Sequence, residues 1–160
     1  MITEHHTQAL KVIIQAAETE PAIVWALTGS TSFALQGMNL IAYDIDVMTN
    51  GEDAYELARR LARYVVKPVA YSQAHNIKSH FGRLNICGVD VEIMGDIQKK
   101  LPDGTWEPVF EIAPVTKLIQ QEGMTIPVIT LTHEARAYRI LGRTERADAI
   151  ERHLQPHATD

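Results

Sequence analysis

The sequence has little of several features that would place it in a specialised class. Only one of its 160 residues, Cys87, is a cysteine, so an intrachain disulfide is impossible and a reducing compartment is expected. No apolar run approaches the length of a membrane span. The first residues lack the basic segment and the apolar run of a secretory signal. These absences predict a cytoplasmic protein that is not held in a membrane.

Strong charge is missing as well. The formal net charge of -5 is mild, and no Lys/Arg block occurs, so the sequence carries no electrostatic footprint for nucleic acid or a membrane surface. Hydrophobic residues make up 46% of the chain, which is enough for a core in a domain of this length. No stretch has the composition of an interdomain linker. We therefore expect a single domain over residues 1–160.

Hydrophobic spacing predicts helices alternating with strands. Helices are expected over residues 3–20, 30–37, 51–66 and 132–154, the last broken near Gly142, and strands over 22–28 and 43–49. Two hairpins are expected, over residues 80–94 with a turn at Cys87-Gly88 and over 116–130 with a turn at Glu122-Gly123. This pattern predicts an α+β fold: a small mixed, mainly antiparallel sheet packed by helices, with a helical C-terminus.

Two aspartates lie one residue apart in the apolar run YDIDVMT. Because strand residues alternate between faces, Asp44 and Asp46 share one face, about 6.5 Å apart along the strand. Unpaired buried carboxylates are costly, so a cation is expected beside them. Hard oxygen ligands suit magnesium, and this spacing suits one divalent ion or a pair about 3.5–4 Å apart.

Gly29 and Ser30 follow an apolar strand and open a predicted helix. Backbone N–H groups there can point at an anion, and the serine hydroxyl can donate to a phosphate oxygen. Alone, Asp-x-Asp is more often a solvated or capping pair, and Gly-Ser is more often a simple turn. Their order along the chain is much rarer than either motif. Together they predict a site for a nucleoside triphosphate with magnesium.

A third strand, GVDVEIMGD, again places two carboxylates, Asp90 and Glu92, on one face. Either side chain could join the two aspartates. For Asp90 the alternative is a solvated residue at the sheet edge.

At these residues the chain resembles the minimal nucleotidyltransferases of the DNA polymerase beta-like superfamily. The resemblance rests on WALTGS, YDIDVM and VEIM, and it extends through SHFG, EIMGDI and AYRILGR. It implies the nucleotidyltransferase fold and a magnesium-dependent enzyme that transfers a nucleoside monophosphate to a hydroxyl acceptor and releases pyrophosphate. AMP from ATP is the favoured donor group.

The same resemblance assigns roles to individual residues. It implies that Gly29 and Ser30 hold the triphosphate. It also implies that Asp44, Asp46 and Glu92 are catalytic and bind the metal, with two Mg²⁺ ions favoured.

Four further residues are possible members of the site. The resemblance favours Glu92 over Asp90 as the third carboxylate, because the family's carboxylate directly precedes a hydrophobic stretch, although many relatives carry aspartate at this place. His80 could contact the substrate or the nucleotide, or could make structural hydrogen bonds. Arg139 and Arg143 could reach the triphosphate, or could lie on a solvated helix face.

The acceptor is not selected by any local feature. The absence of a separate helical domain argues against the larger self-sufficient antibiotic-modifying enzymes. The open groove that remains could be completed by a second copy in a homodimer, by a small helical partner protein or by the acceptor itself. Three hypotheses remain: an enzyme, an antitoxin-type partner of a HEPN ribonuclease toxin, and a catalytically silent nucleotide-binding module.

Overall fold

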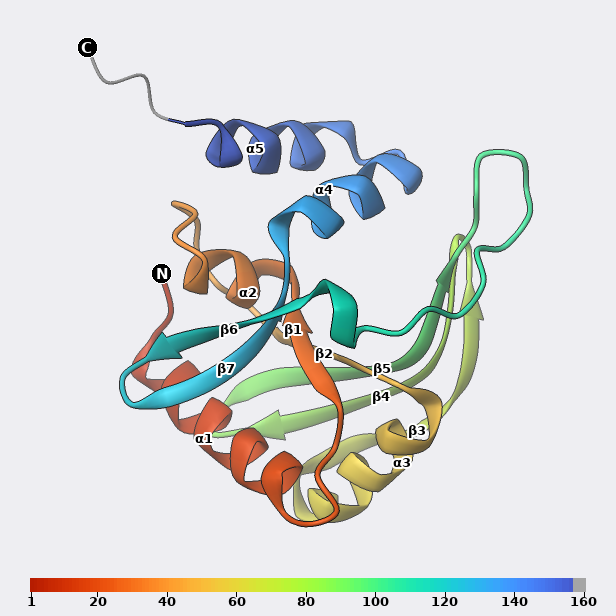
Figure 1. Cartoon of the computed structure of the whole chain (residues 1–160). Coiled ribbons are helices and arrows are strands. Elements are labelled where there is room, and N and C mark those ends of the chain that lie inside the picture. The colour runs from red at the N-terminus through yellow and green to blue at the C-terminus, as the bar shows by residue number, and fades with distance from the viewer. Residues whose placement is uncertain (157–160) are drawn as a thin grey trace.

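A computed structural model describes residues 1–156 of the chain. Seven strands form one sheet in the order β3-β4-β5-β2-β1-β7-β6 (Figure 1). The strands are β1 (Trp25–Thr28), β2 (Ile45–Thr49), β3 (Val65–Ala74), β4 (Ile77–Ile86), β5 (Val89–Lys99), β6 (Thr116–Gln121) and β7 (Met124–Ile129). The pairs β2–β5 and β1–β7 are parallel, and the other neighbouring pairs are antiparallel. The predicted mixed, mainly antiparallel α+β fold is confirmed.

Five α-helices and two short 3-10 helices complete the described part of the chain. They are α1 (Glu4–Glu18), α2 (Gly29–Leu35), α3 (Gly51–Arg60), η1 (Ala62–Tyr64), η2 (Ala113–Val115), α4 (Leu131–Ile140) and α5 (Thr144–Leu154). Within residues 1–156, no helix combines the length and the apolar character that a membrane crossing requires.

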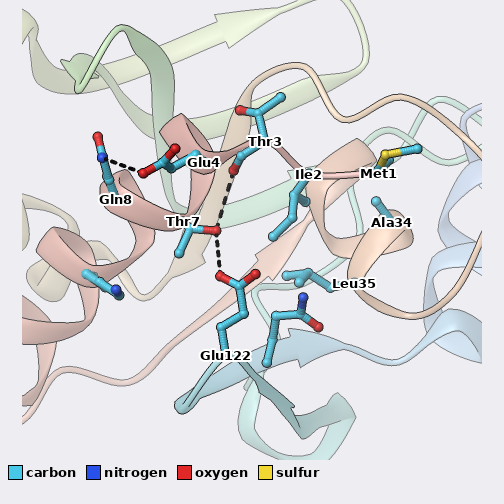
Figure 2. Close-up of a pocket in the computed structure, with 11 residues that line it drawn as sticks. Met1, Ile2, Thr3, Glu4, Thr7, Gln8, Ala34, Leu35 and Glu122 are labelled. Carbon is cyan, nitrogen blue, oxygen red and sulfur yellow. Dashed lines mark hydrogen bonds between the residues drawn. The ribbon is translucent and has the colours of Figure 1, made fainter.

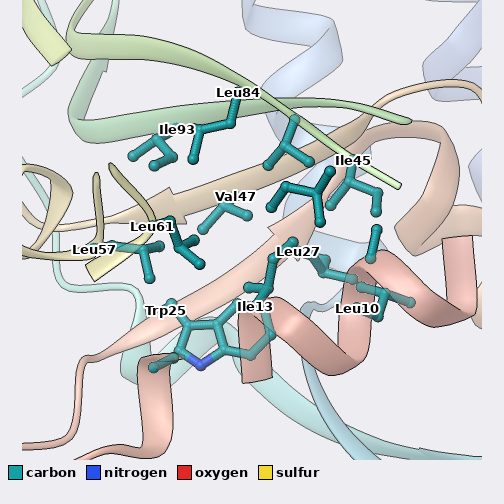
Figure 3. Packing of buried hydrophobic residues seen from close by; sticks show 14 of the residues in the cluster. Leu10, Ile13, Trp25, Leu27, Ile45, Val47, Leu57, Leu61, Leu84 and Ile93 are labelled. Atoms are coloured by element: carbon teal, nitrogen blue, oxygen red, sulfur yellow. The ribbon is translucent and has the colours of Figure 1, made fainter. Parts of the chain in front are cut away.

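The main hydrophobic core lies between one face of the sheet and the helices α1 and α3 (Figure 3). In α1, Leu10 and Ile13 recur at helical spacing and are fully buried. They pack with strand residues such as Leu27 and Val47, and Leu57 of α3 joins the same cluster. The alternate residues of these strands therefore face the other side of the sheet, where the acids lie.

That second face is covered differently. A small cluster that includes Met48, Ile97 and Ile129 lies on it. Near the end of β1, the helices α2, α4 and α5 pack on each other around Phe33 and Ile150. Figure 1 shows α4 and α5 beyond α2, away from the α1 side of the sheet. A cleft lies between this strand surface and α4, which together with α2 and α5 forms the helical cap of the molecule.

The helix predicted over residues 51–66 is too long. The structure ends α3 at Arg60, and β3, which the sequence did not predict, begins at Val65 after a 3-10 turn. β3 lies at the edge of the sheet and pairs with β4 alone, with register shifts between Val65 and Ala70. An edge strand tolerates irregular pairing and a proline, here at position 68. The sequence of β3 therefore shows no clear alternation of apolar and polar residues, and its proline argues against a strand.

The predicted turns are confirmed. Both hairpins turn where the sequence places them, and their turn residues have positive φ: Cys87 at 53°, Gly88 at 82°, Glu122 at 49° and Gly123 at 77°. Gly142, at φ 75°, separates α4 from α5.

The first hairpin is longer than predicted, because β5 continues past Met94 to Lys99. Between the pairs Lys78–Gln98 and His80–Gly95, β5 contains one residue more than β4. This bulge includes Asp96, whose φ is 50°.

Candidate active site

A row of four side chains crosses the middle of the sheet. Thr28 of β1 pairs with Asp46 of β2, Asp46 pairs with Glu92 of β5, and Glu92 pairs with Arg83 of β4. Residues directly opposite each other on neighbouring strands point to the same face of a sheet. The topology therefore brings together two of the three predicted catalytic carboxylates, although they lie far apart in the sequence.

The surroundings of Asp46 make the charged form of its carboxyl group unfavourable. Burial, the negative charge of Glu92 and a hydrogen bond with that side chain together raise its pKa to about 7. Asp44 adds a smaller repulsion. Two carboxyl groups this close favour sharing a proton when no cation lies beside them.

Arg83 is a cationic neighbour of Glu92. Nη2 of Arg83 lies 3.5 Å from Oε1 of Glu92, and their side chains are 47% and 25% exposed. Glu92 is therefore partly exposed, so that an incoming hydroxyl group could reach it.

Gly29 is required by its contact with Asp46. Its φ is 73°, and a Cβ added to it would lie 2.2 Å from Oδ2 of Asp46. A side chain would need both a disfavoured backbone conformation and a displaced carboxylate. The Gly29–Ser30 turn and the acid row are thus packed directly against each other.

The segment before β2 is held by hydrogen bonds to its backbone. Tyr43 N donates to Oγ of Ser30 (3.0 Å), and the Thr31 hydroxyl donates to the carbonyl oxygen of Asp44 (2.8 Å). Nε2 of His6 lies 2.7 Å from the carbonyl oxygen of Tyr43. Because Ser30 accepts here, its own O–H remains able to donate to a ligand. The backbone of Asp44 is fixed, whereas its side chain is exposed.

The fit of this donor set to a metal is partial. Asp46 and Glu92 supply adjacent carboxylate oxygens, which are ligands that magnesium prefers. Within residues 1–156, however, no three His, Cys, Asp or Glu side chains are arranged as a ready metal site. The exposed Asp44 is the group that would have to complete it.

A cleft of about 260 Å³ opens beside the row. Gly29, Asp46 and Glu92 lie in its wall. Its apolar lining comes from Met48, Ile77, Met94, Ile97, Ala137 and Leu141, and its remaining polar lining from Thr28, Lys99, Tyr138 and Arg143. The cleft thus joins the carboxylates, the Gly29 turn and the helical cap.

The two predicted arginines lie in different places. Arg143 lines the cleft, and its guanidinium lies 5.9 Å from the ring centre of Tyr138. Arg139 instead bonds Asp148 and Glu151 of α5, each at 2.7 Å. Only Arg143 is therefore placed where it could meet a nucleotide.

His80 and Asp90 lie outside the cleft lining. His80 pairs with Gly95, on the sheet face that packs against α3, and its Nδ1 lies 2.8 Å from the hydroxyl of Tyr55. Asp90 is exposed and accepts a hydrogen bond from Asn85 (3.0 Å). The structure favours structural roles for both.

Two buried charged residues near the cleft were not singled out from the sequence. Lys99 is 5% exposed, and its ammonium lies 3.1 Å from Glu107; it reaches the cleft only because of the bulge at Asp96. Glu134 of α4 is 4% exposed and accepts a hydrogen bond from the Thr28 hydroxyl. Its helical spacing from the buried Leu131 was a usable signal for burial.

A larger pocket, of about 660 Å³, lies away from these residues. It is formed by the start of α1, the end of α2 and the β6–β7 turn (Figure 2). Across it, the Thr7 hydroxyl donates to Glu122 (3.2 Å). None of the predicted site residues lines it, so its size does not make it the candidate active site.

Comparison with known proteins gives a consistent result. Residues 9–154 match the family described as aminoglycoside-2″-adenylyltransferase. A Thermotoga maritima protein described as a predicted nucleotidyltransferase is 42% identical, with a TM-score of 0.84, over 96% of this chain and 95% of that one. No curated protein matches the chain. The family match and this neighbour confirm the resemblance to nucleotidyltransferases.

Two more distant structures share the fold. The lincosamide antibiotic adenylyltransferase LnuA, bound to lincomycin, is 12% identical with a TM-score of 0.58, over 94% of this chain and 98% of that chain. ANT(2″)-Ia, in complex with adenylyl-2″-tobramycin, is 11% identical with a TM-score of 0.58, over 96% and 91%.

Proposed function

Because the chain belongs to the aminoglycoside-2″-adenylyltransferase family and is a nucleotidyltransferase, we propose that it transfers AMP from ATP, with magnesium, to a hydroxyl group of an acceptor. The observation that carries the proposal is the packing of Asp46 between Gly29 and Glu92. This contact places a carboxylate pair directly against the turn proposed to hold the triphosphate. The family description supports ATP as the donor.

In the proposed reaction, the acceptor oxygen attacks the α-phosphorus and forms the new P–O bond. The bond between the α-phosphorus and the bridging oxygen breaks, and pyrophosphate leaves with the electron pair. The acceptor proton passes to a carboxylate, for which the partly exposed Glu92 is favoured. Most of the rate enhancement in such transfers comes from positioning and electrostatics.

The other residues of the site would act on the donor. The backbone at Gly29 and the free O–H of Ser30 would bind phosphate oxygens, and Arg143 would balance phosphate charge from the helical side. Asp46 and Glu92, joined by Asp44, would hold magnesium, which supplies charge neutralisation at the α-phosphate and the leaving pyrophosphate.

The acceptor is proposed as a small molecule. The chain spans 98% of LnuA and 91% of ANT(2″)-Ia, so its length does not count against an acceptor of antibiotic size. Lincomycin and tobramycin, named with those two proteins, are therefore suitable first acceptors to test.

The test uses ATP labelled on its α-phosphate, with magnesium or with chelator. The acceptors are tobramycin, lincomycin and a cell extract, and Asp46→Asn is the matched control. We expect magnesium-dependent label on a small molecule, and its loss in the variant. Label on a small helical protein would instead favour the antitoxin-type hypothesis. Tight ATP binding without any transfer would favour a silent binding module.

A further inference from the structure

Glu134 is a buried carboxylate that the proposed reaction does not use. It is 4% exposed, it lies on α4, and its Oε1 accepts a hydrogen bond from the hydroxyl of Thr28, a residue 106 positions earlier in the chain. The pKa of Glu134 is raised to about 7, because the effect of burial outweighs the lowering by the Thr28 hydrogen bond and by the nearby Lys99. Burying a carboxylate is costly, and an apolar residue would fill this position at lower cost.

Thr28, the partner of Glu134, also lacks a stabilising interaction that its position would allow. It occupies the N-cap position of α2, but its side chain makes no capping hydrogen bond. A threonine at this position normally accepts from a backbone N–H of the helix, which is worth about 1 kcal/mol in general. Here the hydroxyl makes no such bond, and it donates its proton to Glu134. Both partners of the Thr28–Glu134 contact are therefore unfavourable for local stability: Glu134 is a buried carboxylate, and Thr28 does not cap its helix. Such residues are typical of functional sites.

The contact joins the two walls of the cleft. Thr28 directly precedes the Gly29–Ser30 turn and pairs with Asp46 across β1 and β2. Glu134 lies one helical turn before Tyr138, and the same helix leads to Arg143, both in the cleft lining.

We propose that Glu134 is a positioning residue for nucleotide binding: its hydrogen bond with Thr28 fixes the start of the Gly29–Ser30 turn and sets α4, with Tyr138 and Arg143, against the carboxylate row. The proposal rests on the nucleotide site of the proposed function. It assigns no contact between Glu134 and the substrate.

Four single variants and one double variant test it. Thr28→Ser and Glu134→Gln keep a donor and an acceptor for the contact, whereas Thr28→Val and Glu134→Leu remove one partner. The double variant Thr28→Val/Glu134→Leu replaces both by apolar groups, which is expected to restore the melting temperature.

Affinity for Mg·ATP, measured by calorimetry, should follow the hydrogen bond and not the melting temperature. Thr28→Ser and Glu134→Gln should bind within about twofold of the wild type. Thr28→Val, Glu134→Leu and the double variant should all bind about five- to tenfold more weakly, equivalent to one lost hydrogen bond. If the double variant recovers affinity together with its melting temperature, the contact only stabilises the fold and the proposal is wrong.

A ligand-free measurement keeps this test separate from the proposed function. Amide hydrogen exchange over residues 28–31 should be faster in Glu134→Leu and in the double variant, and unchanged in Glu134→Gln. Unchanged exchange in the double variant would overturn the positioning role. Absence of Mg·ATP binding by the wild type would instead contradict the proposed function, and the exchange data would still decide whether Glu134 holds the turn.

Discussion

At the scale of single residues, the site depends on close contact between a backbone and a charge. Gly29 lies so near Asp46 that one added carbon would overlap the carboxylate. The sequence predicted Gly29 for the approach of phosphate, and the structure adds a second requirement for the same residue. Both requirements follow from the missing side chain.

Gly29→Ala should therefore disrupt both the fold locally and the nucleotide site. Gly104→Ala is a matched control, because Gly104 also has a positive φ, of 88°, but an added Cβ would meet nothing within 4 Å. Both variants carry the strain of an alanine at positive φ, about 1–2 kcal/mol. Only Gly29→Ala should lose more stability than this, and only it should abolish the thermal response to Mg·ATP. Equal melting temperatures and equal responses for the two variants would remove the Gly29–Asp46 contact from the site.

At the scale of elements, the positions of Asp46 and Glu92 could largely be predicted from the sequence, whereas the position of the helical cap beside them could not. Asp46 and Glu92 could be found because each lies in an apolar strand whose alternation sets the face it occupies. Lys99 could not be placed, because a single extra residue at Asp96 changes which side chains of β5 face the cleft. β3 was missed because an edge strand can pair irregularly with its one neighbour, and its sequence then lacks the regular alternation that predicts a strand.

The arginines show the limit of helical spacing. Arg139 and Arg143 are four residues apart, a spacing that puts both on one face of a helix only where the helix continues through them, and the sequence already predicts a break near Gly142. The turn at Gly142 ends the helix between them, and Arg139 then pairs with α5 while Arg143 lines the cleft. Spacing within a helix predicts a shared face only as far as the helix continues.

This separation predicts opposite outcomes for the two arginines. Arg143→Ala should weaken Mg·ATP binding by about tenfold, because it removes a cation from the cleft, and should hardly change the melting temperature. Arg139→Ala should lower the melting temperature by freeing Asp148 and Glu151, and should leave nucleotide binding unchanged. Calorimetry and thermal melting of both variants measure this. Equal binding losses would return Arg139 to the nucleotide site.

At the scale of the whole molecule, the acid row links stability to pH. The pKa of Asp46 is raised to about 7 in the folded protein, against about 4 in an unfolded chain. The folded state therefore binds a proton more tightly, so this contribution to stability is full below about pH 4 and is lost as pH rises through 7. The raised pKa of Glu134 acts in the same direction. In chelator, the wild type should melt at progressively lower temperature over this range.

Asp46→Asn tests the link because it keeps the shape of the side chain and removes its charge. At pH 8 in chelator, the variant should melt at the same temperature as the wild type or higher, and its melting temperature should depend less on pH. The dependence that remains would come from Glu134 and, in the opposite direction, from His133, whose pKa burial lowers.

Adding magnesium and ATP should reverse this order. Ligand at about 100 times its dissociation constant stabilises a protein by about 2.7 kcal/mol, and the variant, which lacks a ligand oxygen, should gain little of this. Transfer activity should fall by orders of magnitude in the same variant. If Asp46 only makes a structural hydrogen bond, Asp46→Asn should instead be less stable in chelator, by about 1 kcal/mol, and magnesium should not change the ranking. Melting curves of both proteins at pH 5 and pH 8, with and without Mg·ATP, separate the two cases, and a destabilised variant that still transfers AMP would exclude Asp46 from the active site.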